Sequence, residues 1–129
     1  MTLANQYMKY MAQSVSASTP GEQIVMLFEH ASMKLAKAIQ CIEAKDVQGA
    51  HNALVRAQNI YQFLSDCLDM RYEISNNLYA LYQYAIDELT AANLKKDPEI
   101  VRRILKMTRD FEDTWKKADL KTRLERSAR

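Results

Sequence analysis

The stretch STPGEQIVMLFEHA, residues 18–31, contains the start of a helix and then five consecutive apolar residues. Thr19 precedes Pro20, and Glu22 follows three residues after Thr19, which is a capping box with proline at the first helical position. The apolar run Ile24–Phe28 then points to nearly every side of that helix, whereas a surface helix normally has one apolar stripe. The surplus apolar side chains therefore need an explanation.

Length and composition predict one domain with a hydrophobic core. The chain has 129 residues, of which 48% are hydrophobic and 26% are charged, a balance typical of a single globular domain. We find no run of about 18 apolar residues, so we expect no membrane span. The first eleven residues lack the pattern of a signal peptide. These features predict a cytosolic protein.

Two further segments carry helix-start signals. Asp97 before Pro98 repeats the first signature, and Asp46 stands three residues before Gly49. Between residues 68 and 72 the apolar periodicity breaks without glycine or proline, and we place a turn there. The resulting four helices are expected at residues 19–45, 47–68, 72–95 and 98–120. Because the connections are short, we predict an all-α, antiparallel up-down four-helix bundle.

The two ends of the chain differ from the bundle. Residues 1–18 hold a short amphipathic segment and a serine-rich connector, which is marginal as an isolated helix. We expect this segment to be a flexible cap that docks on the bundle at residues 19–120. Residues 116–129 carry six basic residues against two acidic ones, a net charge of +4, which leaves −2 for the rest. We expect residues 121–129 to form a basic, frayed tail.

Several apolar residues lie beside the core stripes of the first and third helices: Val25, Met26, Tyr79, Tyr82 and Ile86. Methionine repacks easily, and tyrosine combines apolar area with a polar tip that tolerates water. Each residue alone has a simpler explanation, a wider core or single exposure. As a set, together with the amphipathic N-terminal segment, they indicate a groove that receives a helical segment.

Catalytic and metal-binding patterns are weak. Cys41 and Cys67 stand alone, and neither His30 nor His51 belongs to a Glu-x-x-His ligand pair. We therefore expect no metal or other cofactor and no enzymatic activity. One alternative is a histidine phosphotransfer bundle that uses His30, with Lys34 as the stabilising cation. Another is a helical adaptor whose exposed stripe associates with a second copy.

Three blocks and one tryptophan carry a family resemblance. The blocks are STPGEQIVMLFEHA (18–31), RAQNIYQFLSDCLD (56–69) and NNLYALYQYAIDELTAAN (76–93), and the tryptophan is Trp115 in the expected fourth helix. In this order they resemble the FliS family of flagellar export chaperones, over about residues 7–117.

The resemblance implies a binding function. It implies a protein that holds the disordered C-terminal segment of flagellin in apolar surface grooves, where Val25, Met26, Tyr79, Tyr82 and Ile86 are the candidates. It also implies that the N-terminal segment covers the empty groove. Tyr7 and Tyr10 match aromatic positions that help docking on the export gate protein FlhA. No aromatic residue interleaves with the charges of the basic tail, so we expect no contact with nucleic acid. Other flagellar regulators are further candidate partners.

Overall fold

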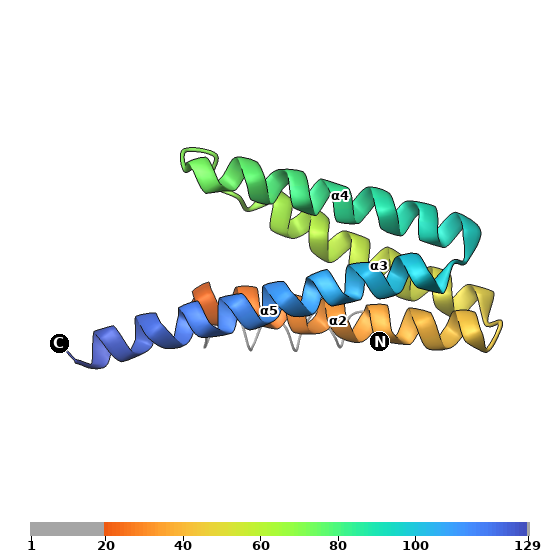
Figure 1. Cartoon of the computed structure of the whole chain (residues 1–129), viewed down its shortest axis with the longest axis horizontal. Coiled ribbons are helices and arrows are strands. Elements are labelled where there is room, and N and C mark those ends of the chain that lie inside the picture. Colours follow the sequence, from red (N-terminus) through yellow and green to blue (C-terminus); the bar gives the residue numbers. More distant parts are fainter. Residues whose placement is uncertain (1–19, 129) are drawn as a thin grey trace, which may run out of the picture.

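The computed structural model describes residues 20–128, and these form four helices without a strand (Figure 1). Consecutive helices run in opposite directions, and α2 lies between α3 and α5. This arrangement confirms the predicted all-α bundle. The expected cap at residues 1–18 lies outside the described residues. The helices are α2 (Pro20–Glu43), α3 (Val47–Asp66), α4 (Glu73–Lys95) and α5 (Pro98–Ser127).

Two of the predicted helix starts are confirmed by their caps. The Asp46 side chain accepts a hydrogen bond from the Gly49 amide at 3.0 Å, and the Asp97 side chain accepts one from the Glu99 amide at 2.9 Å. Each bond satisfies one of the amides that a helix start leaves without an intrahelical partner. Thr19, the expected cap of the first helix, lies outside the described residues.

The helix ends depart from the sequence expectations. Helices α2 and α3 end two residues earlier than expected, at Glu43 and Asp66, whereas α5 continues to Ser127 instead of ending at residue 120. The extension is supported by Arg123, which forms ion pairs with Asp119 at 2.9 Å and with Glu22 of α2 at 3.2 Å. The structure therefore places residues 121–127 in a helix rather than in a frayed tail.

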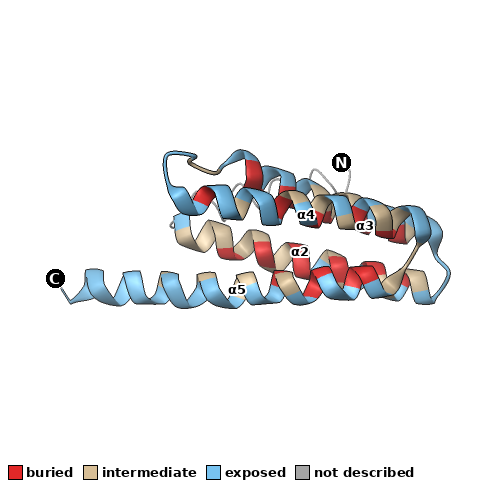
Figure 2. Cartoon of the chain, turned by 45° about the horizontal axis from the view of Figure 1, so that its top comes forward, coloured by how far each residue is buried: buried red, intermediate tan, exposed pale blue. Residues whose placement is uncertain are grey.

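Four aromatic side chains, one from each helix, meet at the centre of the core. Phe28 and Phe111 stack with ring centroids 5.2 Å apart, and Tyr82 lies 5.6 Å from Phe111 and 5.8 Å from Tyr61. Phe28, Tyr61 and Tyr82 are each at most 2% exposed. Figure 2 shows the buried residues on the inward sides of the helices. Because all four helices contribute a ring, the cluster fixes their relative placement.

Packing is uneven around the bundle. Helix α2 packs extensively against both α3 and α5, whereas α4 packs chiefly on α3 and has its smallest contact with α5. In Figure 1 the α3–α4 pair diverges from the α2–α5 pair toward the α3–α4 connection. The first half of α4 therefore lies farther from α5 than its second half does. None of the described helices is long and apolar enough to cross a membrane.

Candidate binding surface

Two of the five predicted groove residues belong to the core. Tyr82 is 2% exposed and Val25 is 9% exposed, so the expectation that they line an open groove is corrected. Tyr82 lies three residues before Ala85 and seven before Leu89, which places all three on one side of α4. Val25 lies three residues before the buried Phe28, which places both on one side of α2. Sequence periodicity alone places both residues beside the core stripe.

A row of apolar residues on α4 lies along the edge that faces α3. It consists of Tyr79 and Ile86, seven residues apart, together with Tyr72, the N-cap residue that precedes the helix, and is called the tyrosine flank here. The neighbouring Gln83 fixes this orientation, because its amide donates to Ser65 Oγ of α3 at 3.1 Å. Tyr79 is 47% exposed and Ile86 is half-buried. The two predicted residues Tyr79 and Ile86 thus share one edge of one helix.

The opposite edge of α4 carries a second apolar row, the leucine flank, which consists of Ile74, Leu78 and Leu81. Glu88, seven residues after Leu81, forms an ion pair with Arg103 of α5 at 3.2 Å, so this edge faces α5. Their spacing of four and three residues is that of an apolar core stripe, which predicts that all three are buried. The structure corrects this for Ile74 and Leu81, which are 64% and 42% exposed, because the first half of α4 diverges from α5.

Exposed apolar residues are concentrated around the α3–α4 connection. Of the twelve large hydrophobic residues exposed in the described chain, seven lie between residues 63 and 84. We call these seven the hairpin surface. Sequence reasoning missed Phe63, which lies on α3 outside its buried stripe, and Met70, which lies in the turn, where no periodicity applies. The members are Phe63, Met70, Tyr72, Ile74, Tyr79, Leu81 and Tyr84.

Polar contacts order the connection itself. Arg71 forms an ion pair with Asp69 at 2.6 Å, and Ser75 Oγ donates to the Asp69 carbonyl oxygen at 2.6 Å. The hydrogen bonds from Arg71 lower the pKa of the Asp69 carboxyl. The apolar side chains around this turn are thus presented on a hydrogen-bonded loop.

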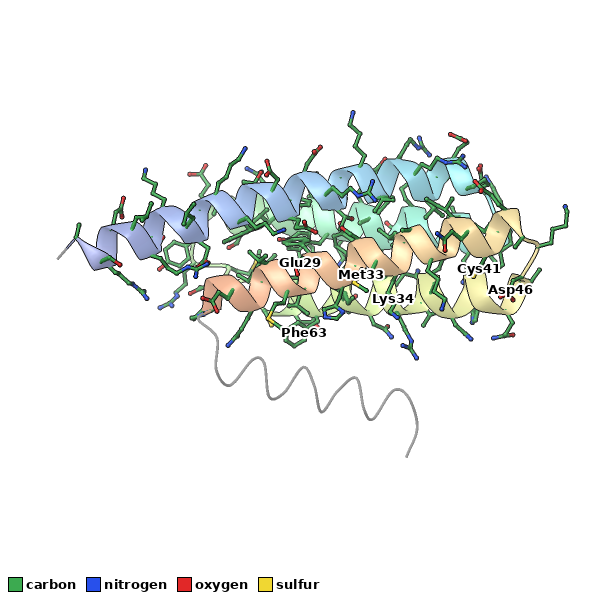
Figure 3. The ribbon with its side chains drawn as sticks, turned by 90° about the horizontal axis from the view of Figure 1, so that it is seen from below. Glu29, Met33, Lys34, Cys41, Asp46 and Phe63 are labelled. Carbon is green, nitrogen blue, oxygen red and sulfur yellow. The ribbon has the colours of Figure 1, made fainter. Side chains whose placement is uncertain are left out.

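The remaining predicted residue, Met26, lies on a different part of the bundle. It is half-buried on α2, where Met33 is 64% exposed. Figure 3 shows Met33 and Phe63 from the side formed by α2 and α3. Because α2 has no extensive contact with α4, the structure does not bring Met26 on α2 together with Tyr79 and Ile86 on α4 in a single groove.

His30 is poorly suited to phosphoryl transfer. The residue is half-buried, and its pKa is lowered first by burial and then by the nearby charge of Lys34, against a smaller opposite effect of Glu29. A phosphoacceptor imidazole needs access for its donor, which partial burial restricts. No group of three or more potential metal ligands occurs among residues 20–128. Tyr7 and Tyr10, the expected gate contacts, lie outside that range.

Comparison with known proteins gives the family. The family model described as "Flagellar protein FliS" matches residues 3–122. The chain belongs to the FliS family. Its members are flagellar export chaperones rather than enzymes, as the sequence resemblance implied.

Individual FliS relatives match over most of their length. The flagellar secretion chaperone FliS of Bacillus subtilis is 35% identical over 92% of this chain and 89% of its own. Its counterpart from Salmonella typhimurium is 32% identical, over 88% and 87% respectively. A solved structure described as "Crystal structure of flagellar chaperone from bacteria" has a TM-score of 0.72 at 16% identity and covers 89% of this chain and 95% of its own. That likeness supports the fold.

Proposed function

We propose that this chain acts in the cytosol as a flagellin chaperone. In this account it binds the disordered C-terminal segment of flagellin, prevents early polymerisation and aids delivery to the export gate protein FlhA. The observation that supports the proposal best is the hairpin surface, where seven large hydrophobic side chains are exposed within 22 residues. Exposed apolar area of this density is typical of a surface that a partner covers.

The two flanks of α4 suit a segment that folds on binding. Residues seven apart on a helix are about 10 Å apart along its axis, which matches the spacing of apolar anchors on an amphipathic partner helix. Ordering a disordered chain costs conformational entropy, so the receiving surface must supply compensating apolar contacts. Tyrosine hydroxyls keep the empty surface compatible with water. Tyr79, Ile86 and Leu81 are our proposed contacts.

Calorimetry with the C-terminal segment of flagellin tests the proposal. Leu81→Asp and Tyr79→Asp each place a charge on one flank of α4, and we expect each to weaken binding at least about tenfold. The matched control is Leu94→Asp, since Leu94 is 83% exposed near the other end of the same helix. The control variant should bind like the natural chain, and circular dichroism should show all three folded. Equal affinity of all three variants would overturn the proposal.

A deletion separates the proposed cap from the binding surface. If the N-terminal segment competes with flagellin, removing residues 1–15 should preserve or raise affinity, because the binding-competent state becomes more populated. A large loss of affinity would instead make the segment part of the site. Replacing Tyr7 and Tyr10 by alanine in the full chain should weaken FlhA binding and leave the flagellin affinity unchanged.

A further inference from the structure

The C-terminal part of α5 extends beyond the start of α2, as Figures 1 and 2 show. Its base is tightly held. The Asp119 side chain is 8% exposed, and a Cβ atom at Gly21 would lie 2.4 Å from Asp119 Oδ1, so a side chain at position 21 would displace this carboxylate. Arg123 links Asp119 to Glu22 of α2. The extension is thus a helix anchored at its base rather than a loose tail.

The extension carries an apolar stripe on a face separate from this anchor. Leu120, Leu124 and Ala128 are spaced four residues apart, and the two leucines are 54% and 62% exposed. Lys117, Lys121 and Glu125 line the same shallow hollow, and Lys117 also forms an ion pair with Asp113 at 2.9 Å. Asp119 and Trp115 line a different hollow, together with Gly21 at the start of α2. The leucines therefore face away from α2, and nothing in the described chain covers them.

Electrostatics determines which partner suits the stripe. Residues 116–128 hold five basic residues against two acidic ones, a net charge of +3. Among the described residues, Lys121 and Arg126 form no ion pair, and Asp119 is engaged by Arg123. A second copy of this chain would bring another positive extension against the first, which is repulsive. The surface is complementary to an acidic partner.

We propose that the α5 extension, residues 117–128, docks an acidic amphipathic helix of a partner protein. Leucines four residues apart form a ridge that packs against the apolar stripe of another helix, and the lysines beside them meet carboxylates on its flanks. A lipid surface fits less well, because membrane-surface helices insert larger apolar faces with aromatic residues, and this stripe has two leucines and no aromatic. The proposal does not depend on flagellin binding.

Two designed peptides test the proposal on the full chain. The probe is a labelled helical peptide of about 18 residues, with leucines three and four residues apart and glutamates beside them. The reference peptide has lysines in place of the glutamates. Fluorescence anisotropy should detect binding of the acidic peptide, weakened by salt, and at least about tenfold weaker binding of the reference.

Variants assign the binding to the stripe. Leu120→Ser with Leu124→Ser, and separately Lys121→Glu, should each weaken binding of the acidic peptide about tenfold or more. The controls are Leu94→Ser on α4 and Lys106→Glu on the body of α5, both exposed, and these should have no effect. Three results would overturn the proposal. They are absence of acidic-peptide binding, unchanged affinity of the leucine variant, and leucine-dependent binding to phosphatidylglycerol vesicles without peptide binding.

Discussion

The phenol of Tyr61 on α3 donates a hydrogen bond to Thr108 Oγ1 on α5 across the buried centre of the bundle, with 2.5 Å between the two oxygens. The direction follows from the next bond, in which the Thr108 hydroxyl donates its only proton to the Ile104 carbonyl oxygen at 2.7 Å. Both side chains are fully buried. This two-bond chain joins two helices that are 47 residues apart in sequence at these positions.

The two partners of this bond should differ in their contribution to stability. Thr108→Val leaves the buried Tyr61 hydroxyl without its acceptor, which should lower the free energy of unfolding by about 1–3 kcal/mol. Tyr61→Phe leaves Thr108 its bond to Ile104 and should cost about 1 kcal/mol. Urea denaturation of both variants and of the double variant measures the difference. A larger loss for Tyr61→Phe than for Thr108→Val would contradict the donor assignment.

The core tyrosines predict a loss of stability at high pH. Burial raises the pKa of the Tyr82 phenol from 10.0 to about 12, and burial also raises the pKa of Tyr61. As pH rises above 10, the tyrosines of the unfolded chain lose their phenol protons before those of the folded chain do. The free energy of unfolding therefore declines as pH rises from about 10 to about 12. Denaturation curves measured across this pH range should show a smaller decline in the free energy of unfolding for Tyr82→Phe than for the natural chain. Equal declines in the variant and the natural chain would show that Tyr82 does not cause the loss of stability at high pH.

A pair of substitutions on α4 tests the corrected placement of its tyrosines. Tyr82→Asp puts a charge among the core aromatics and should lower the free energy of unfolding by more than about 3 kcal/mol. Tyr79→Asp changes an exposed position on the same helix and should cost less than about 1 kcal/mol. Thermal melts followed by circular dichroism compare the two. Similar melting temperatures would show that Tyr82 is not a core residue.

The connection between α2 and α3 offers a stabilising substitution. Lys45 adopts a left-handed conformation with φ of 60°, which is unfavourable for residues with a Cβ and natural for glycine. Lys45→Gly should therefore raise the free energy of unfolding by about 0.5–1 kcal/mol. This net gain already includes the opposing effect that glycine makes the unfolded chain more flexible. The control is Lys37→Gly in the interior of α2, which should destabilise the protein by about 1 kcal/mol. A decrease with Lys45→Gly would contradict this interpretation of the turn.

Local signals in the sequence predict much of the fold. The caps at Asp46 and Asp97 predict two helix starts, and apolar periodicity predicts the four helices and most of their buried faces. Helix ends are harder, because a lysine in the left-handed conformation at Lys45 or Lys96 has no distinctive signal. The continuation of α5 depends on the contact between Arg123 and Glu22, which are about a hundred positions apart.

The surface is predicted less well because burial depends on how the helices diverge. Ile74 and Leu81 have the spacing of core residues, and only the separation of α4 from α5 exposes them. Tyr82 has the chemistry of a surface residue, yet it lies against Phe28, Tyr61 and Phe111. Periodicity gives the direction in which a side chain points, and tertiary packing determines what it meets there.

Hydrogen exchange of the full chain, with and without the C-terminal segment of flagellin, tests the central claim most directly. If the segment covers the hairpin surface, peptides from residues 63–84 should become protected, because docking suppresses local opening of this part of the bundle. Peptides from residues 117–128 serve as an internal reference and should not change. Protection confined to α2 and α5, with residues 63–84 unaffected, would contradict the account.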